Sequence, residues 1–561
     1  MSRSSIEFDA IRQAQSPFDL LRRQAELWPD QPLLILPKAV QTLWGLDRSV
    51  WTYAEALAEV SQLASAYREA GYGPGHRVAL MFENRPQHFF HWLALNSVGT
   101  SVVPLNPDYK DEELIYALDH SAACLIASVP ACLPRLKVAA QAKGLTVWLE
   151  GPLPGAPLSS GATVGREEDR ECVLAYTSGT TGKPKGCILS NRYFLCWGEW
   201  YVAQEGKIRL REGRERLITP LPTFHINAMG NSFVGMLASA GAQIIVDRFH
   251  PRSWLDMARE TGASCFHYLG VMPAILLALP ESAEDRSHNL RFGLGGGVHP
   301  DHHSQFETRF GVPLLEGWAM TEAGGAALLC AAEEPRQIGT RCIGSPDRPG
   351  PGLDWRIVDD AGRDVVQGQS GEFLLRAKGA DPKRGFFSGY LNDPAATDLI
   401  WADGWLRTGD VMIEDSDGQL HFAERKKDLI RRSGENISGA EVEAVLLAHP
   451  DVRQVAVVPC PDPLREEEVV AVVVAKSADA EPARLAQSLF DHSARLLAYY
   501  KLPGHIVFIN DLPVTSTGKL AKGAIRALAS DTETNYPRFD LRAQKQAQRL
   551  AEQNRHEGSQ P

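Results

Sequence analysis

The sequence predicts an α/β protein in which a large N-terminal domain precedes a small α+β domain. Three observations lead to this fold class. Apolar strands alternate with helical patterns in the first half, short extended pieces occupy 342–377, and a new strand and helix order starts near Lys427. The length of 561 residues also exceeds what one core usually organises. We expect 1–426 to form the large domain, 427–530 the small domain and 531–561 a polar tail.

The first half of the chain carries the α/β alternation. Short apolar runs predict buried strands at 77–81, 99–104, 124–129 and 243–247. Amphipathic patterns predict helices at 53–70, 86–98 and 112–120. Strands that alternate with helices in this way usually form a parallel sheet whose faces the helices cover.

The later segments differ in pattern. Pro and Gly turns separate the extended pieces of 342–377, which predicts a small β-rich subdomain. Beyond Lys427 we expect a first strand, a helix at 439–448, strands at 454–458 and 468–475, a second helix and a last strand at 506–509. The residues after Arg526 are polar, and we expect them to be frayed or only partly helical.

The composition is typical of a large soluble enzyme. A formal net charge of −11 argues against a general nucleic-acid or anionic-membrane surface, so a nucleotide would be bound locally. The 9 cysteines are scattered without a Cys-x-x-Cys pair, which indicates neither a disulfide framework nor a zinc site. The N-terminus lacks an apolar signal region, and no apolar run reaches the ~20 residues of a membrane span. We expect a cytoplasmic protein without an integral membrane segment.

The loop Tyr176-Thr-Ser-Gly-Thr-Thr-Gly-Lys-Pro-Lys-Gly186 follows an apolar run and is built to hold phosphate. Glycines let backbone N–H groups approach an anion, while hydroxyl and ammonium groups add donors and positive charge. The residues that we expect to surround a polyphosphate are Thr177, Ser178, Gly179, Thr180, Thr181, Gly182, Lys183 and Lys185. A Walker A loop needs four residues between its glycines and a Ser or Thr after its Lys. Here two residues separate the last two glycines before the Lys, and a Pro follows it, so a Walker A loop is excluded. The alternative is a solvated Gly/Thr turn.

Further motifs follow in order along the chain. They are Trp318-Ala-Met-Thr-Glu322, Gly371-Glu-Phe-Leu-Leu-Arg-Ala377, Trp405-Leu-Arg-Thr-Gly-Asp410, Glu424-Arg-Lys-Lys-Asp428 with Ser433-Gly-Glu-Asn-Ile437, and Thr517-Gly-Lys519. With them the chain resembles the adenylate-forming superfamily of acyl-CoA synthetases, nonribosomal-peptide adenylation domains and firefly-type luciferases. The resemblance implies two helix-covered sheets and a β-rich subdomain in the large domain, and a mobile small domain. It also implies ATP, Mg²⁺ and, as co-substrate, CoA.

The resemblance also assigns roles around the nucleotide. Glu322 would coordinate Mg²⁺, and Thr321 would donate a hydrogen bond to the α-phosphate. Trp318 would stack on adenine, although Ala319 replaces the glycine that usually follows this aromatic residue; packing at a strand end is the alternative for Trp318.

Two further groups complete the expected nucleotide site. Gly295, Gly296 and Gly297 would meet adenine and line the acyl pocket, and Val298 excludes a dinucleotide-binding GxGxxG motif. Asp410 would take the ribose hydroxyls together with Arg425, whereas each residue alone would be read as a surface charge.

The resemblance places the remaining roles in the small domain. Lys519 would bridge the carboxylate and the α-phosphate during adenylation. Lys427 occupies the hinge position, for which a surface Lys-Lys run is the alternative. A swing about this hinge would remove Lys519 and bring Ser433 and Gly434 towards the pantetheine tunnel, where glycine suits close approach.

The acyl pocket gives weaker signals. By resemblance, His225 would gate the carboxylate or acyl pocket, and the stretches 222–227 and 309–315 are most similar to crotonobetaine/carnitine-CoA ligases. A quaternary ammonium acid would call for an aromatic cage, and Trp197, Trp200 and Tyr201 would share one helix face. Helix packing is the simpler interpretation of that stripe. The sequence around His299, His302 and His303 is read as an exposed turn and helix start and not as a metal site.

We therefore predict an ATP-dependent carboxylate:CoA ligase that forms an acyl-AMP intermediate. A carboxylate is a poor acyl donor until its oxygen becomes part of a good leaving group such as AMP. The substrate would be a small or medium carboxylic acid, with betaine-type acids included. The chain ends soon after Lys519 without a carrier-protein segment, which favours CoA as acceptor. A stand-alone adenylation enzyme that loads a carrier protein is the alternative, a non-catalytic or luciferase-like relative is the third class, and a homo-oligomer stays open.

Overall fold

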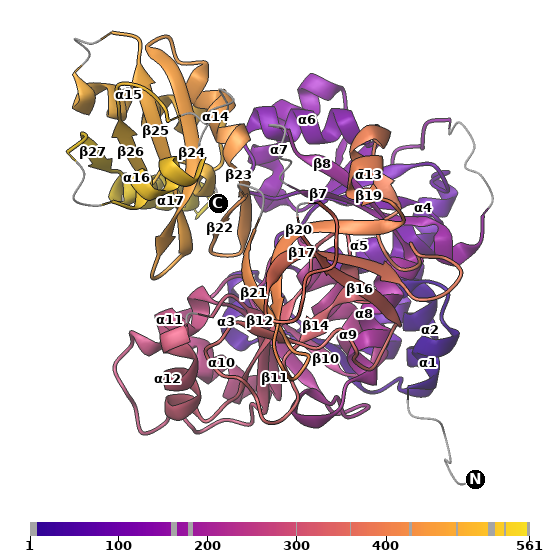
Figure 1. Cartoon of the computed structure of the whole chain (residues 1–561). Coiled ribbons are helices and arrows are strands. Elements are labelled where there is room, and N and C mark those ends of the chain that lie inside the picture. Colours follow the sequence, from indigo (N-terminus) through magenta and orange to yellow (C-terminus); the bar gives the residue numbers. More distant parts are fainter. Residues whose placement is uncertain are drawn as a thin grey trace.

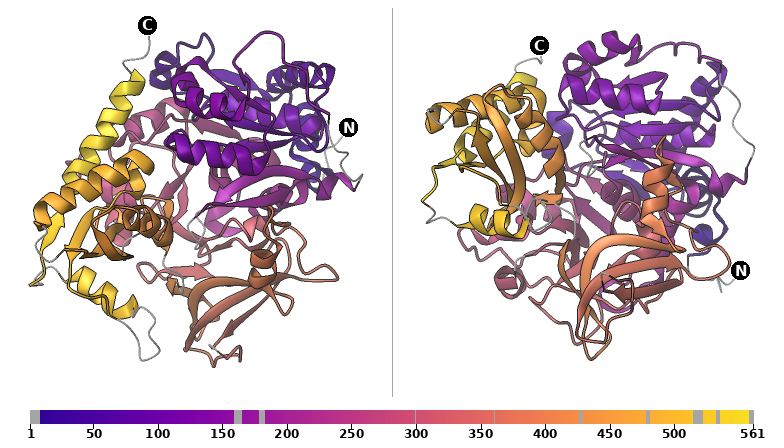
Figure 2. Two further views of the ribbon diagram at one scale, coloured as in Figure 1. Left: turned by 90° about the horizontal axis from the view of Figure 1, so that it is seen from above. Right: turned by 45° about the horizontal axis from the view of Figure 1, so that its top comes forward.

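The computed structural model describes residues 8–158, 165–177, 183–298, 300–359, 361–425, 429–477, 481–513, 522–531 and 535–557. A large body carries a smaller C-terminal lobe at one side, and the views in Figure 1 and Figure 2 agree on this arrangement. The large body contains three sheets and the lobe contains a fourth. This organisation confirms the α/β class and the large and small parts that the sequence predicts.

The first sheet of the body has seven strands, and its central strands are parallel. In spatial order they are β18 (Gly389–Tyr390), β8 (Lys185–Ser190), β7 (Glu171–Thr177), β4 (Ser101–Pro104), β3 (Arg77–Met81), β5 (Leu125–Ser128) and β6 (Val147–Trp148). The helices that connect or follow these strands are α4 (Tyr53–Glu69), α5 (Pro86–Ser97), α6 (Asp111–Ser121), α7 (Leu133–Lys143) and α8 (Asn191–Ala203). The predicted strands at 77–81, 99–104 and 124–129 are therefore β3, β4 and β5, separated as expected by helices.

The second sheet has eight strands. In spatial order they are β14 (Leu329–Cys330), β13 (Leu314–Trp318), β12 (Phe292–Gly296), β11 (Cys265–Leu269), β9 (Arg216–Thr219), β10 (Ala242–Ile245), β1 (Pro32–Ile35) and β2 (Val50–Thr52). Its helices are α1 (Asp9–Gln13), α2 (Pro17–Leu27), α3 (Lys38–Leu43), the π-helix η4 (Asn227–Val234), α9 (Gly235–Ala238), α10 (Trp254–Thr261), α11 (Val271–Leu277) and α12 (Pro300–Phe310). The predicted strand at 243–247 corresponds to β10.

One continuous core joins these two sheets through helices that are buried on most sides. The ring of Phe89 on α5 stacks on Phe233 of η4 with centroids 4.2 Å apart, and Trp92 packs against Phe194 of α8 at 4.9 Å. Aromatic burial of this extent dominates core energetics. The core thereby fixes α8 and η4, which form one wall of the cavity described below.

The β-rich subdomain is present and extends further than the pattern at 342–377 indicates. Its strands are β15 (Cys342–Gly344), β21 (Leu420–Arg425), β20 (Trp405–Glu414), β17 (Ser370–Ala377) and β16 (Leu353–Val358), with β19 (Trp401–Ala402) paired to β20 and α13 (Pro394–Ile400) before it. The long central strand β20 pairs with β17 and β21 in antiparallel register, with Asp410 opposite Arg425.

The C-terminal lobe is a separate α+β unit with its own sheet. Its strands are β23 (Glu435–Ser438), β22 (Leu429–Arg432), β25 (Glu466–Ala475), β26 (His505–Phe508) and β27 (Arg538–Asp540), with β24 (Val452–Asp462) paired to β25. Its helices are α14 (Gly439–Leu447), α15 (Pro482–Leu496), α16 (Lys522–Ser530) and α17 (Arg542–Glu557). Two hydrophobic clusters lie in this lobe, one with residues of α14 and α15 and one with residues of α16.

The segment after residue 530 differs from the expected polar tail. Strand β27 pairs with β26, and the ammonium of Lys545 on α17 is buried, with its Nζ 2.6 Å from Glu468 Oε1. Lys545 Nζ also donates to the Leu502 carbonyl, and the Arg549 guanidinium lies 5.5 Å from the ring centre of Tyr499. These contacts dock a largely polar helix, so the sequence pattern alone misses the docking. Residues 535–557 therefore belong structurally to the lobe.

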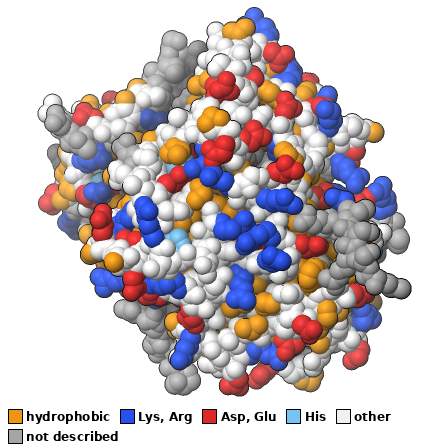
Figure 3. Space-filling model, turned by 90° about the horizontal axis from the view of Figure 1, so that it is seen from below, with side chains coloured by type: hydrophobic (Ala, Val, Ile, Leu, Met, Phe, Trp, Pro, Cys, Tyr) orange, Lys and Arg blue, Asp and Glu red, His pale blue; other side chains and the backbone are white. Residues whose placement is uncertain are grey.

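The charged side chains on one face of the molecule are visible in Figure 3. On the face in Figure 3, acidic and basic side chains are interspersed, with basic ones denser near the middle, and hydrophobic side chains are scattered. Across the described residues, no helix combines the length and hydropathy needed to cross a membrane.

Candidate active site

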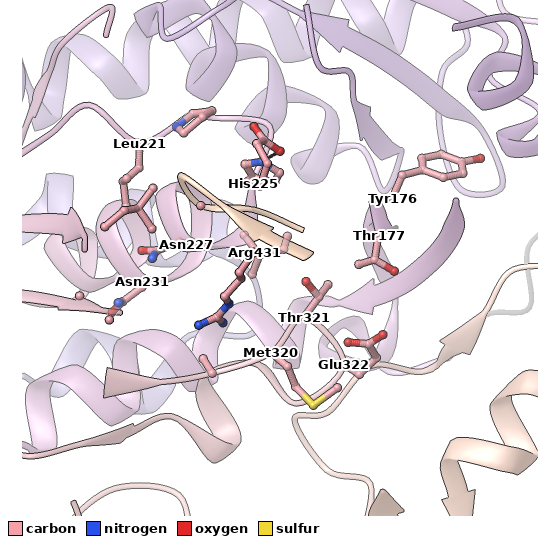
Figure 4. A pocket seen from close by; sticks show the side chains of 18 of the residues that line it. Tyr176, Thr177, Leu221, His225, Asn227, Asn231, Met320, Thr321, Glu322 and Arg431 are labelled. Atoms are coloured by element: carbon pink, nitrogen blue, oxygen red, sulfur yellow. Dashed lines mark hydrogen bonds and ion pairs between the residues drawn. The ribbon is translucent and has the colours of Figure 1, made fainter. Parts of the chain in front are cut away.

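A cavity of about 310 Å³ lies where the large body meets the C-terminal lobe. Its walls come from the ends of β7, β12 and β13, from β20, from η4 and from the turn between β22 and β23. Figure 4 shows Asn231, Thr321 and Arg431, from three separate parts of the chain, around a common space. Ligand sites in open α/β sheets form at such carboxyl ends of strands.

Glu322 and Thr321 lie together at the end of the β13 segment and both line the cavity. Tyr390 donates its hydroxyl proton to Glu322 Oε1 at 2.6 Å, and Tyr193 donates to the Thr321 carbonyl at 2.8 Å. Burial and the nearby Glu322 carboxylate raise the pKa of Tyr390 far above its usual value, so this hydroxyl remains a donor. These two bonds orient the Thr-Glu pair toward the cavity.

The carboxylate of Glu322 fits a magnesium site in which phosphate oxygens and water supply most of the other metal ligands. Among the described residues, no group of three or more His, Cys, Asp or Glu side chains could hold a metal by itself. Mg²⁺ commonly takes one or two protein carboxylates and completes its shell with phosphate oxygens and water. Glu322 at the phosphate end of the cavity matches that donor set.

The phosphate loop connects two paired strands. Thr177 ends β7 opposite Lys185, the first residue of β8, and both residues line the cavity. The Nζ of Lys183 lies 5.2 Å from the ring centre of Tyr116, and that of Lys185 lies 4.9 Å from the ring centre of Tyr390. The predicted ligands Ser178, Gly179, Thr180, Thr181 and Gly182 lie outside the described residues.

Trp318 and Asp410 form a buried pair. The indole Nε1 donates to Asp410 Oδ2 at 2.8 Å, and the two residues are 4% and 1% exposed. The indole ring also packs edge-on against Phe373. Gly317 and Ala319, on either side of Trp318, line the cavity. The structure thus places Trp318 where it orients the Asp410 carboxylate, and stacking on adenine stays a prediction.

The glycine segment at the end of β12 forms a narrow part of the cavity wall. A Cβ at Gly295 would lie 2.2 Å from the Tyr268 carbonyl oxygen, and one at Gly296 would lie 2.9 Å from the Gly317 carbonyl oxygen. Gly297 adopts φ +78° and lies beside the Glu466 carboxylate. The backbone approach at these positions excludes a side chain, as the sequence indicates.

The turn Ser433-Gly434 reaches the cavity from the C-terminal lobe. Both residues have positive φ, 51° and 87°, in a two-residue loop between β22 and β23, the geometry of a tight hairpin. A Cβ at Gly434 would lie 2.1 Å from Leu269 Cδ1 at the end of β11. Beside this turn, His225 Nε2 lies 3.2 Å from Glu435 Oε2. Gly434 and His225 therefore line the cavity together, whereas the Ser433 hydroxyl accepts a hydrogen bond from Arg465 Nη1 at 3.3 Å.

Comparison with known proteins agrees with this architecture. Residues 21–391 match the family model described as AMP-binding enzyme, and residues 441–519 match the model of the AMP-binding enzyme C-terminal domain. The chain belongs to the AMP-binding enzyme family. It is an AMP-forming acid-thiol ligase of the adenylate-forming acyl-CoA ligase superfamily, as the motifs indicate.

Individual relatives cover nearly the whole of this AMP-binding enzyme. A sulfoacetate–CoA ligase of Cupriavidus necator is 31% identical over 90% of this chain and 96% of its own length. A crotonobetaine/carnitine–CoA ligase of Escherichia fergusonii is 27% identical over 85% of this chain and 93% of its own length. The amide bond synthetase McbA from Marinactinospora thermotolerans superposes with a TM-score of 0.75 at 26% identity, covering 91% and 100% of the two chains.

Several expected site residues of this AMP-binding enzyme have no described side chain. Lys519 and Lys427 lie outside the described residues. Arg425 lies in β21 opposite Asp410, and only its backbone is described. The roles expected for these three residues stay predictions.

The structure confirms helix packing for two of the three residues of the aromatic stripe. Of its three residues, Trp197 lines the cavity, whereas Trp200 and Tyr201 are fully buried in the core and Tyr201 OH lies 3.1 Å from His267 Nε2. These three residues therefore do not form a cage, and helix packing accounts for two of them.

The expectation of exposed histidines at the start of α12 was incorrect for His303. This residue is 4% exposed, and its Nε2 lies 2.9 Å from the Leu314 carbonyl oxygen. Adjacent residues of a helix project in different directions, so only one of two neighbouring histidines faces the core. His299 lies outside the described residues.

The sequence motifs do not mark two cationic residues of the lobe that the structure places near the cavity or at the contact with the body. Arg431 lines the cavity, and Figure 4 shows its guanidinium pointing into the space between Asn231 and Thr321. Lys501 is 3% exposed, and its Nζ lies 2.5 Å from Glu113 of α6 and 2.8 Å from Glu441 of α14. Arg431 is two residues from the Ser433-Gly434 motif, which could have drawn attention to it. No sequence pattern marks Lys501, because its partners are far away in the chain.

Proposed function

We propose that this ligase couples a small or medium carboxylic acid to CoA in two steps, with ATP consumed to AMP and pyrophosphate. The observation that carries the proposal is the convergence of Glu322, Thr321, Lys185 and Asp410 in one cavity that the Gly434 turn closes from the lobe. One end of this cavity carries phosphate-binding chemistry. The other end is lined by apolar and amide side chains that suit an acyl group.

In the first step the acid carboxylate attacks the α-phosphate of ATP, and the bond to pyrophosphate breaks. Two anions must approach each other, so positive charge and oriented donors are required. Lys185 and the hydroxyls of Thr177 and Thr321 would hold phosphate oxygens, and Asp410 would take the ribose hydroxyls; the position of all four residues in the lining of one cavity supports these roles. Glu322 would hold Mg²⁺, which neutralises phosphate charge when bound. Lys519 would bridge the two reacting groups.

In the second step the CoA thiol loses its proton to solvent and attacks the acyl carbonyl. The thioester bond forms, and AMP leaves with the electron pair of the broken C–O bond. The close contact between Gly434 and Leu269 supports an arrangement of the lobe that serves this step. Lys427 would act as the hinge that exchanges this arrangement for one with Lys519 in the cavity. Ser433 and His225 would then line the path of the thiol arm.

We also propose CoA as the acceptor and the cytoplasm as the compartment. CoA is the acceptor in the names of both relatives described above, and a carrier protein or an amine is the alternative acceptor. All nine cysteines are free thiols, which supports a reducing cytoplasm.

The experiment is mass spectrometry of the purified protein with ATP, Mg²⁺, CoA and a pool of short, branched, aromatic, hydroxylated, sulfonated and betaine-type acids. We expect a new acyl-CoA together with stoichiometric AMP. Acid-dependent pyrophosphate release without acyl-CoA would show that the acceptor is not CoA. The absence of AMP for every acid would contradict the ligase proposal.

A further inference from the structure

The acyl wall of the cavity carries buried polar atoms that lack a partner. Within the described part of the chain, Oδ1 of Asn227, Oδ1 of Asn231 and Nε1 of Trp197 form no hydrogen bond. Asn231 is 5% exposed and Trp197 is 3% exposed, and all three residues line the cavity. Figure 4 shows the side chains of Asn227 and Asn231 on the same side of the cavity. Buried polar groups are nearly always paired, so a bound molecule is the expected partner.

The local structure explains why these atoms face the cavity. Asn227 and Asn231 lie on the π-helix η4, a geometry that is concentrated at functional sites. A Cβ at Gly230 would lie 2.6 Å from Trp197 Nε1, so only glycine lets the indole edge pack beside Asn231. The neighbouring Tyr193 hydroxyl donates its proton to the Thr321 carbonyl at 2.8 Å.

Other polar groups on the same helix are satisfied inside the protein. Ser232, adjacent to Asn231, has its Oγ 2.8 Å from His267 Nδ1. Ser232 therefore lies on the core side of η4, and Asn231 lies on its cavity side. The unpaired amides are therefore confined to the side that a ligand would contact.

The wall formed by α8 and η4 is polar but carries no charge. Its cavity-lining members are Trp197, Asn227 and Asn231, and the charged side chains that line the cavity come from other elements. An indole N–H only donates, whereas an amide both donates and accepts. A hydroxyl group, which also donates and accepts, satisfies both. A hydrocarbon end would leave the polar atoms unpaired. A sulfonate only accepts hydrogen bonds, so it would leave the acceptor Oδ1 of Asn231 without a donor, although Arg431 points into the space beside Asn231.

We propose that the acid substrate carries an uncharged hydroxyl group at its end remote from the carboxylate, held by the amide of Asn231 and the indole N–H of Trp197. This inference rests on the ligase function proposed above and names the class of acid that the site selects. The hydroxyl oxygen accepts from Trp197, and the hydroxyl proton is donated to Asn231 Oδ1.

The test compares acids of one carbon skeleton that end in a hydroxyl, a methyl or a sulfonate group. The readout is kcat/KM for acid-dependent AMP formation. We expect the wild-type enzyme to prefer the hydroxy acid over its deoxy analogue by about tenfold to a hundredfold, the usual effect of leaving a buried polar group unpaired. Asn231→Leu should abolish most of that preference, while the matched Asn510→Leu, at an exposed position of the lobe, should retain it.

A second variant protects the test from a folding defect. Trp197→Phe keeps a ring against Gly230 but removes the N–H, and we expect it to lower the preference while deoxy acids are still adenylated. Equal turnover of the hydroxy and deoxy acids by the wild-type enzyme, a sulfonate preference, or an unchanged preference in both variants would overturn the inference and leave the ligase function standing. The absence of AMP with every acid would overturn the ligase function itself.

Discussion

At the residue scale, buried hydrogen bonds to carboxylates organise the nucleotide end of the cavity. Tyr390 donates to Glu322 at 2.6 Å, and Trp318 donates to Asp410 at 2.8 Å. Hydrogen bonds to charged acceptors in a low-dielectric site are stronger and more directional than bonds between neutral groups. Each carboxylate is therefore held in position before a ligand arrives, which lowers the ordering cost of binding.

The variant Tyr390→Phe tests this positioning of Glu322. Loss of one hydrogen bond to a carboxylate usually costs about 1.5–3 kcal/mol, so pyrophosphate release should fall by about tenfold to a hundredfold. If Glu322 holds Mg²⁺, the Mg²⁺ concentration needed for half-maximal rate should rise as well. The measurement is the initial rate across a Mg²⁺ titration. An unchanged Mg²⁺ requirement would separate Tyr390 from the metal-binding role of Glu322.

A carboxylate outside the cavity predicts a pH dependence. Burial opposes the ionisation of Glu307, but hydrogen bonds from Arg336 and His303 outweigh it and lower the pKa of Glu307 from 4.5 to about 2. Because the pKa is lowered in the folded state, the stabilisation is present above pH 4.5 and is lost as the pH falls toward 2. The linked free energy is at most about 3 kcal/mol.

The variant Glu307→Gln isolates this contribution. The difference in Tm between the wild-type protein and the variant should be largest near neutral pH and should shrink as the pH falls below 4.5. Thermal unfolding at several pH values measures it. A difference that stays constant down to pH 3 would refute the assigned linkage.

At the element scale, the hairpin between β22 and β23 carries the contact of the lobe with the cavity. Its turn residues Ser433 and Gly434 both have positive φ, which suits the twist of a two-residue hairpin loop. A Cβ at position 434 would lie 2.1 Å from Leu269 Cδ1, so a side chain there would force the Leu269 side chain to move, and the φ of +87° strains any residue other than glycine. This element therefore decides whether the lobe can dock at the mouth of the cavity.

The variant Gly434→Ala should disrupt that docking. Its Cβ would overlap Leu269, so thioester formation from supplied acyl-AMP should fall at least tenfold while acid-dependent pyrophosphate release changes much less. The matched control is Gly368→Ala, since Gly368 has a φ of +88° and no atom within 4 Å of its added Cβ. The two half-reactions are measured separately by rapid quench.

Leu269→Ala provides a second control for the same contact. In the Gly434→Ala background it removes the overlapping side chain, and we expect it to restore part of the thioester-forming rate. Equal losses in both half-reactions for Gly434→Ala, or an equal effect of Gly368→Ala, would contradict the docking role of the hairpin.

At the scale of the whole molecule, a buried ion cluster joins the body to the lobe. Lys501 of the lobe contacts Glu113 of the body and Glu441 of the lobe, and Asn106 Nδ2 donates to Tyr500 OH at 3.3 Å beside it. Burial opposes the charge on Lys501, but the two carboxylates raise its pKa above the usual value. A buried charge is stable only where its ion-pair partners are close to it. This cluster therefore favours the arrangement of body and lobe that brings Glu113 to Lys501.

The variant Lys501→Met should weaken this arrangement. It leaves Glu113 and Glu441 facing each other without a cation, and breaking a buried ion pair in this way typically costs about 3–5 kcal/mol. We expect the docked arrangement to be lost and the thioester-forming step to fall by tenfold or more relative to adenylation. The control is Lys476→Met, at an exposed position of the same lobe. Restoration by the triple variant with Glu113→Gln and Glu441→Gln would support the cluster, and an unchanged ratio of the two rates would contradict it.

The sequence predicts individual strands, helices and glycine-rich loops well, because each of these features depends on residues that are close together in the chain. Strands β3, β4, β5 and β10 follow from apolar runs, and the phosphate-binding role of the loop at 178–182, which lies outside the described residues, stays a prediction. The sequence does not predict the pairing of Asp410 with Trp318, since 92 positions separate the two residues. It also does not predict that β27 and α17 complete the lobe, because one buried lysine on a polar helix carries no periodic signal.

The sequence by itself determined the family and the α/β class, because these follow from short motifs and from local periodicity, and it predicted the phosphate-directed side chains from the same motifs. Only the tertiary structure decided which aromatic residues of α8 face the cavity, how Lys501 joins α6 to α14, and that Asn227 and Asn231 present unpaired amides to the acyl wall. These features arise from contacts between elements far apart in the chain. Their energies depend on burial and on partners, which no local pattern specifies.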